Sequence, residues 1–216
     1  MARSKKDTPF WTTGIAAIAI ISALFLGLGS TSIYIVDESR NAQAGWEMLQ
    51  SGDHIVPHFN RGLRGDKPPL HYWFMTIAYA IGGKTAFAAR FFSAFVGLLL
   101  IAGLYQFSRR YHRSEVGFWL VLCCASAVYL PLQLRLATPD PYLIAFFGLG
   151  MLAIWYGWQQ QHLGYLLSGY LFIGLASLAK GPIAPAMAGL SMVIFLLWDG
   201  KLKWTYIRQF RPFLGA

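Results

Sequence analysis

The sequence contains little charge for its length. Only 12% of its 216 residues are Asp, Glu, Lys or Arg, whereas soluble domains carry about 25%. Hydrophobic residues make up 56% and aromatic residues 16%. Many of the aromatic residues lie near the ends of apolar runs, where membrane-interface belts place them. The low charge excludes an ordinary soluble domain and indicates an integral membrane protein.

Cysteine is also scarce, and acidic residues are fewer than basic ones. Cys123 and Cys124 are adjacent within an apolar run, which favours packing residues over a disulfide or a metal site. The 18 basic and 9 acidic residues give a net charge of +9, but the basic residues lie in short tracts between apolar runs. This pattern is typical of topology determinants and of contacts with membrane lipids. Nucleic-acid binding is not expected, because no recognition module is visible.

Six apolar runs are each long enough, or nearly so, to cross the hydrocarbon core, which takes about 20 residues. They predict an all-α bundle of about six spans. The basic N-terminus precedes the first run without a convincing cleavage site, which favours a retained span over a removed signal peptide. The last two runs are short, and a broken pair is the alternative. The runs are residues 10–34, 87–107, 116–134, 142–158, 165–179 and 183–198.

A further apolar stretch, residues 70–81, lies between a Pro-Pro and a Gly-Gly pair. Its length predicts an interfacial or re-entrant helix rather than a span. With this stretch outside the span count, the basic tracts after the second and sixth runs join the N-terminus on the cytoplasmic side, as the positive-inside rule requires. The loop 35–86 and the turns at Asp140 and Lys180 then share the outer face.

The outer loop begins with a helical pattern. Residues 38–50 predict an amphipathic helix with Ala42, Trp46 and Leu49 on one face. Such a helix is expected to lie on the membrane surface. Asp37 stands at its start, where a carboxylate is alternatively a helix cap.

Four other charged residues have a structural and a functional interpretation. Asp66 and Lys67 precede a proline-led helix. In the structural interpretation Asp66 caps this helix and Lys67 reaches the lipid headgroups. Asp140 lies between two prolines as a suitable cap, and Lys180 ends a run before a glycine. Ionisable groups that face a membrane cavity are functional candidates. A carboxylate can take an acceptor's proton, and lysines can hold a phosphate leaving group, so together they predict transfer of a group away from a phosphate.

In these residues the sequence resembles the multi-spanning glycosyltransferases that use polyprenyl-phosphate sugars. The resemblance is strongest to the bacterial aminoarabinose (lipid A) transferases and the protein O-mannosyltransferases. The matching motifs follow one order along nearly the whole chain, and their combination is specific although no single motif is. They are Asp37-Glu38-x-Arg40, Glu47-Met48-Leu49-x-Ser51-Gly52-Asp53, Pro57, Lys67-Pro68, Tyr72-Trp73, Arg90, Asp140-Pro141 and Lys180-Gly181.

The resemblance implies a GT-C-like fold and an inverting sugar transfer. The donor would be a polyprenyl-phosphate-linked sugar, and the acceptor a glycolipid or a protein at the outer face of the bacterial plasma membrane. It implies Asp37 as the general base, with Glu38 beside it, and Lys67 as a contact to the donor phosphate. The other residues implied in the pocket are Arg40, Asp66, Arg90, Asp140 and Lys180.

The resemblance also bears on metals and on chain length. Asp66 stands where the aminoarabinose transferases have Glu, so its side chain is shorter. If a divalent cation takes part, hard oxygen ligands such as Asp66 and Asp140 would suit Mg²⁺ or Mn²⁺. Family members continue with further spans, so residues 1–216 are expected to be an N-terminal membrane module with its catalytic loop at 35–86.

Two alternatives to a transferase stay open. One is an inactive fragment or a non-enzymatic membrane subunit that keeps the fold. The other is a transporter, which is expected to show paired repeats and charges at the bilayer midplane. No repeat is evident in this sequence, and its charges gather at one interface.

Overall fold

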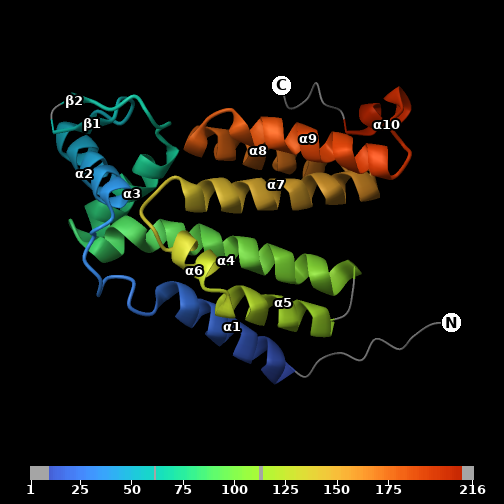
Figure 1. Ribbon diagram of the computed structural model, residues 1–216, viewed down its shortest axis with the longest axis horizontal. Helices are drawn as coiled ribbons and strands as arrows, with labels where there is room; N and C mark the ends of the chain where they lie inside the picture. The colour runs from blue at the N-terminus through green and yellow to red at the C-terminus, as the bar shows by residue number, and fades with distance from the viewer. Residues whose placement is uncertain (1–9, 61, 112–113, 211–216) are drawn as a thin grey trace.

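The computed structural model describes residues 10–60, 62–111 and 114–210, and this part of the chain is mostly helical (Figure 1). This agrees with the all-α membrane bundle expected from the sequence. Two short strands, β1 (His58–Phe59) and β2 (Gly62–Leu63), pair antiparallel in the loop between α2 and α3. The helices are α1 (Phe10–Phe25), α2 (Val36–Ser51), α3 (Leu70–Gly82), α4 (Ala86–Tyr111), α5 (Ser114–Ser126), α6 (Tyr129–Leu134), α7 (Asp140–Gln160), α8 (Leu163–Lys180), α9 (Ile183–Trp198) and α10 (Trp204–Gln209).

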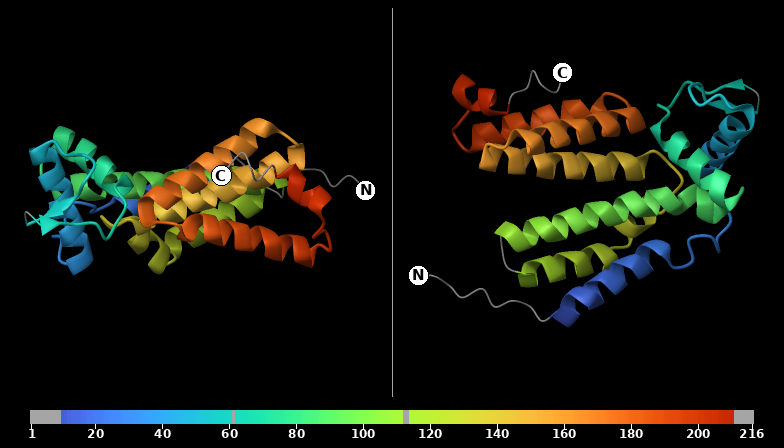
Figure 2. Two further views of the ribbon diagram at one scale, coloured as in Figure 1. Left: turned by 90° about the horizontal axis from the view of Figure 1, so that it is seen from above. Right: turned by 180° about the vertical axis from the view of Figure 1, so that it is seen from behind.

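The apolar helices α1, α4, α5, α7, α8 and α9 run side by side, with α2 and α3 at one end and α10 at the other (Figures 1 and 2). By length and hydropathy, α4, α7 and α8 are able to cross a membrane. Helices α1, α5 and α9 are apolar over 10–17 residues. A multi-spanning helical architecture is therefore confirmed, while the count of six spans stays a prediction.

Helix α3 covers the stretch that was expected to stay out of the bilayer core. It has 13 residues, which at about 1.5 Å per residue gives roughly 20 Å, against a hydrocarbon core of about 30 Å. It packs against α2 and α4 at the end of the bundle. Its length and position agree with an interfacial helix.

The third apolar run is not one helix, and the prediction of a continuous segment over 116–134 is wrong. Helix α5 ends at Ser126, and α6 begins at Tyr129. Pro131 explains the break, because it has no N–H to donate to the carbonyl of Ala127 four residues earlier. The short α6 therefore leads back across the end of the bundle toward α7.

Two other boundaries differ from the apolar runs. Helix α1 ends at Phe25 rather than near residue 34, and Gly27 follows it with a left-handed φ of 68°. Helices α8 and α9 are separate and pack against each other. Gly181, with a φ of 85°, turns the chain between them, because glycine adopts this conformation without a Cβ clash. Whether they form two spans or a broken pair stays a prediction.

The apolar face of α2 packs against α3. Ala42, Trp46 and Leu49 pack in one cluster with residues of α3. The ring of Trp46 meets that of Tyr79 edge-on, with centroids 5.8 Å apart. The placement of this helix on the membrane surface stays a prediction.

Close packing fixes the register between α7 and α8. A Cβ on Gly150 would lie 3.1 Å from the carbonyl oxygen of Gly169, and one on Gly157 would lie 2.7 Å from the backbone nitrogen of Leu166. Small residues allow helix backbones in membranes to approach in this way. The start of α7 and the end of α8 are therefore held at one end of the bundle.

Candidate functional site

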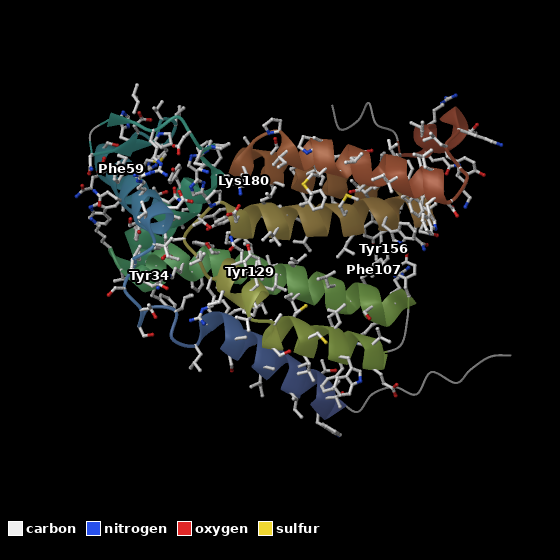
Figure 3. All side chains as sticks on the ribbon, in the orientation of Figure 1. Tyr34, Phe59, Phe107, Tyr129, Tyr156 and Lys180 are labelled. Carbon is white, nitrogen blue, oxygen red and sulfur yellow. The ribbon has the colours of Figure 1, made fainter. Side chains whose placement is uncertain are left out.

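The charged residues at the ends of α7 and α8 lie at the α2–α3 end of the bundle. Helix α7 begins at Asp140 and its neighbour α8 ends at Lys180. The ammonium group of Lys180 donates a hydrogen bond to the Asp140 carboxylate. Figure 3 shows Lys180 toward the end that carries Phe59, while Phe107 and Tyr156 lie toward the other end. The predicted meeting of these two turns is observed.

Asp140 pairs with Lys180 and does not cap α7. The cap position of α7 is Pro139, and no side-chain cap bond is formed there. One carboxylate oxygen of Asp140 accepts from Lys180, and the other accepts from the Gln133 amide at 3.2 Å. The capping interpretation of Asp140 is therefore wrong, and both its oxygens face side-chain donors.

Arg64, which the sequence-based prediction missed, contacts two acidic residues of the outer loop. Its Nη2 lies 3.8 Å from Oδ1 of Asp37, and its Nε lies 3.3 Å from Oδ1 of Asp66. Nη2 also donates to Oδ1 of Asn41 at 2.9 Å. The Arg64 side chain is 8% exposed, whereas those of Asp37 and Asp66 are 52% and 58% exposed. A buried cation thus holds two accessible carboxylates on one wall.

Asn41 joins Arg64 to α3. Its Oδ1 also accepts a hydrogen bond from the Tyr72 hydroxyl at 3.3 Å, and Tyr72 is fully buried. Burial raises the pKa of Tyr72 to about 12, so its phenol stays neutral. The amide therefore receives one charged and one neutral donor and ties α2, the hairpin loop and α3 into one unit.

Lys67 lies where this loop enters α3. Its side chain is half-buried, and within the described part of the chain it has no ion pair. Leu70, three residues on, packs in one buried cluster with Tyr142 and Ala179, which flank the ion pair between α7 and α8. The loop before α3 and the facing ends of α7 and α8 therefore meet, and Lys67 is a cation that the described residues leave uncompensated.

Arg40 is exposed on α2, three residues after Asp37. In residues 10–60, 62–111 and 114–210 it has no ion pair. The structure does not bring it into contact with the Arg64 network, and its place in the pocket stays a prediction.

Glu38 and Arg90 form a buried ion pair on a different side of α2. Arg90 Nε and Nη2 lie 2.7 and 2.8 Å from the two carboxylate oxygens of Glu38, which is fully buried. The backbone N–H of Ala137 donates to the same carboxylate at 2.9 Å. The other Arg90 bonds go to the backbone carbonyls of Leu28, Thr31 and Ser32. Because their donors and acceptors meet protein groups, we interpret this pair as positioning residues beneath Asp37.

His71 is a buried polar residue that the sequence-based prediction also missed. It is fully buried on α3, its ring lies 3.8 Å from that of Tyr72, and neither ring nitrogen has a hydrogen-bond partner in the described structure. Burial, and then the charges of Arg64 and Lys67, lower its pKa to about 3; the Pro68 carbonyl opposes this shift, although its geometry falls short of a hydrogen bond. His71 is therefore neutral and unpaired beside the loop cations.

This burial predicts a pH dependence of stability. Unfolded histidine binds a proton near pH 6.5, whereas folded His71 does so only near pH 3, so its neutral form stabilises the fold above pH 6.5 and this contribution is lost as pH falls. Compared with His71→Leu, the wild type is expected to lose about 2 kcal/mol more unfolding free energy between pH 7 and pH 5. Denaturant titration in detergent checks this. His54→Leu, at an exposed histidine, is the control; equal pH slopes for wild type and His71→Leu would contradict it.

The acidic residues of the described structure do not form a site for a divalent cation. Among the described residues, no group of three His, Cys, Asp or Glu is placed to hold a metal ion. Asp37 and Asp66 both face the Arg64 guanidinium, which occupies the position that a shared cation would need. Asp140 is paired with Lys180. As arranged, these carboxylates do not fit a metal, and a role for Mg²⁺ or Mn²⁺ stays a prediction.

Several known proteins resemble this chain in sequence. The family model for dolichyl-phosphate-mannose-protein mannosyltransferase matches residues 66–216, more than two thirds of the chain. The chain is 34% identical over 207 residues to an undecaprenyl phosphate-alpha-4-amino-4-deoxy-L-arabinose arabinosyl transferase 2 of Sodalis glossinidius, covering 90% of this chain and 36% of that protein. It is 30% identical over 198 residues to the transferase of the same description from Pseudomonas fluorescens, covering 89% and 36%.

A solved structure agrees with the fold. The crystal structure of ArnT from Cupriavidus metallidurans bound to undecaprenyl phosphate superposes with a TM-score of 0.86 and 25% identity, over 95% of this chain and 38% of that one. The GT-C-like architecture expected from the sequence is thereby confirmed. The chain spans a little more than a third of the length of these relatives.

Proposed function

This chain belongs to the dolichyl-phosphate-mannose-protein mannosyltransferase family. On this ground we propose that it takes part in sugar transfer from an undecaprenyl-phosphate-linked donor. Relatives described as arabinosyl transferases, and the related structure bound to undecaprenyl phosphate, support this donor. One observation carries the proposal. Accessible carboxylates on Arg64, the uncompensated Lys67 and the Asp140–Lys180 pair converge at one end of an apolar bundle.

The chemistry follows from what each group offers. The Asp37 carboxylate takes the proton of an acceptor hydroxyl as its oxygen attacks the anomeric carbon of the sugar. The bond from that carbon to the phosphate oxygen breaks on the opposite face, so the configuration inverts and the lipid phosphate leaves with the electron pair. A positioned general base of this kind contributes about 10²- to 10⁴-fold in rate. The exposed Asp37 side chain leaves room for the acceptor.

The leaving phosphate needs cations that hold its developing charge. Lys67 supplies an ammonium group that has no ion-pair partner among the described residues, and Arg64 places a guanidinium beside the general base. Preorganised cations stabilise such charge most strongly where water is excluded. Lys180 offers a further donor from the facing helix end, at present paired with Asp140.

The cellular setting follows from the fold and the basic tracts. Similarity to bacterial transferases and the apolar helices indicate a multi-pass bacterial membrane protein. We place the α2–α3 end at the outer face of the inner membrane and the N-terminus in the cytoplasm, since the basic tract at Arg109 and Arg110 ends α4 on the far side. An amphiphilic acceptor would then approach in the plane of the outer leaflet.

Lys67→Gln tests the proposed donor contact. The variant is expected to bind undecaprenyl phosphate about 10- to 100-fold more weakly, because a hydrogen bond to a charged group contributes about 1.5–3 kcal/mol. Binding is measured by tryptophan fluorescence of the protein in nanodiscs, with undecaprenol, which lacks the phosphate, as the reference ligand.

Lys84→Gln is the matched control. Lys84 is an exposed lysine that follows α3 and donates a hydrogen bond to Gln43. Its loss should leave the affinity for undecaprenyl phosphate unchanged. If the wild type does not distinguish undecaprenyl phosphate from undecaprenol, or if Lys67→Gln binds as tightly as the wild type, the assignment of Lys67 fails.

A further inference from the structure

Aromatic side chains join three helices at the end of the bundle opposite α2 and α3. The ring of Tyr156, on α7, meets those of Phe107 and Tyr111 on α4, whose centroids lie 6.1 and 5.4 Å from its own. It also meets the ring of Tyr165 on α8, at 5.6 Å. Figure 3 shows Phe107 and Tyr156 together at this end. Tyr156 is therefore the centre of an aromatic cluster that links α4, α7 and α8.

Arg110 lies on this cluster. Its guanidinium carbon is 4.9 Å from the centroid of the Tyr156 ring, a distance at which a cation is attracted to the face of an aromatic ring. The Arg110 side chain is exposed, and among the described residues it has no ion pair and no hydrogen-bond acceptor. The ring orients the guanidinium without using its N–H donors. Arg110 is therefore an oriented cation whose donors are available to an anion.

The charge around this stacked cation is positive. Arg109, in the same last turn of α4, has its guanidinium carbon 5.6 Å from the ring centroid of Tyr105, and in the described part of the chain it has no ion pair. Glu115, in the first turn of α5, is exposed and forms no ion pair there either. Asp199, which follows α9, is neutralised by Lys201. These acidic groups leave both arginines uncompensated.

An exposed, mostly apolar stripe on α4 leads away from Arg110 along the bundle. Its members precede Arg110 at steps of three and four residues, which places them on one face of the helix. They are Phe95, Leu99, Ala102 and Gln106, and all four are exposed. In a bilayer such a face contacts acyl chains, while tyrosines at the end of a helix suit the headgroup region. A lipid at this end would therefore place its head at Arg110 and its chains along α4.

We propose that Arg110 and Tyr156 form a binding site for the phosphodiester headgroup of an anionic phospholipid. The guanidinium fork suits two oxygens of one phosphate, and the stripe on α4 suits the acyl chains. Phosphatidylcholine also carries a phosphate, but its choline cation would lie among uncompensated arginines, so a lipid with net negative charge is favoured. In the orientation proposed above, the site faces the cytoplasmic leaflet. It is separate from the transfer site at the α2–α3 end and does not depend on it.

Lipid retention tests this site in the 216-residue chain. The protein is placed in nanodiscs with equal amounts of phosphatidylglycerol and phosphatidylcholine, and the lipids that stay bound after its release are measured by native mass spectrometry. The wild type is expected to retain phosphatidylglycerol preferentially. Arg110→Gln should bind it about 10-fold more weakly, because hydrogen bonds to a charged group are lost. Tyr156→Leu removes the ring that orients the guanidinium and should also weaken retention, whereas Tyr156→Phe keeps the ring and should retain the lipid.

Arg208→Gln is the matched control for a general attraction between a basic surface and anionic lipids. Arg208 is an exposed arginine of α10 at the same end of the bundle, so its loss lowers the net charge equally and should leave retention unchanged. A parallel arm adds inorganic phosphate to the protein in phosphatidylcholine nanodiscs, and no retained phosphate is expected. Equal losses in Arg110→Gln and Arg208→Gln, equal retention of the two lipids by the wild type, or retention of inorganic phosphate as tight as that of phosphatidylglycerol would overturn the proposal.

Discussion

Asp37→Asn is expected to lower the rate of sugar transfer by about 10²- to 10⁴-fold while leaving the affinity for undecaprenyl phosphate nearly unchanged. Asparagine keeps the size of the side chain and can still face the Arg64 guanidinium, which lies 3.8 Å from the Asp37 carboxylate. It cannot accept the proton of the acceptor hydroxyl. Turnover with a labelled lipid-linked sugar, and donor binding measured separately, check both parts of the prediction.

Asp53→Asn is the matched control for this variant. Asp53 is another acidic residue of the outer loop, and its carboxylate accepts the backbone N–H groups of Ile55 and Val56. Those hydrogen bonds lower the pKa of Asp53. This is expected for a carboxylate that stabilises a turn and does not take up a proton during the reaction. Turnover should be unaffected by this change. Full activity of Asp37→Asn, or an equal loss in both variants, would exclude Asp37 as the general base.

Run length and turn position were enough to predict the framework of the site. The stretch at 70–81 is too short to cross a bilayer, and α3 has that length and lies at the end of the bundle. The meeting of Asp140 and Lys180 followed from counting spans, since both stand at turns of one face. Such features depend on the local sequence and on the order of the elements, and a single sequence is enough to give both.

The partners of the charged residues could not be predicted in this way. Arg64 reaches Asn41, 23 residues earlier, and this contact depends on the path of the β1–β2 hairpin, in which Asn60 has a left-handed φ of 52°. The glycines on both sides of this arginine are typical of a turn but do not give the direction of the loop. His71 carried no signal either, because its missing partners are visible only in three dimensions. The break at Pro131, in contrast, was readable from the proline itself.

Pairing over a long sequence distance also gives the second large prediction, which concerns Arg90. Arg90→Met is expected to lower the free energy of unfolding by about 3–5 kcal/mol, because it leaves the carboxylate of Glu38 buried without a cation. The same substitution frees the carbonyls of Leu28 and Thr31 that Arg90 now binds. Denaturant titration of the protein in mild detergent measures the loss, and Arg109→Met, at an exposed arginine of the same helix, is the control.

The double variant Glu38→Met with Arg90→Met distinguishes a stabilising role from a positioning one. Removing both charges should restore most of the lost stability, since a buried ion pair is often replaced by apolar residues without net cost. Transfer should remain slow even so, because the Ala137 N–H loses its acceptor and the first turn of α2, which carries Asp37, loses its link to α4. The rate constant for turnover should fall more than donor affinity. Recovery of both stability and turnover in the double variant would show that the pair does not position Asp37, and a stable Arg90→Met variant would contradict the buried pair itself.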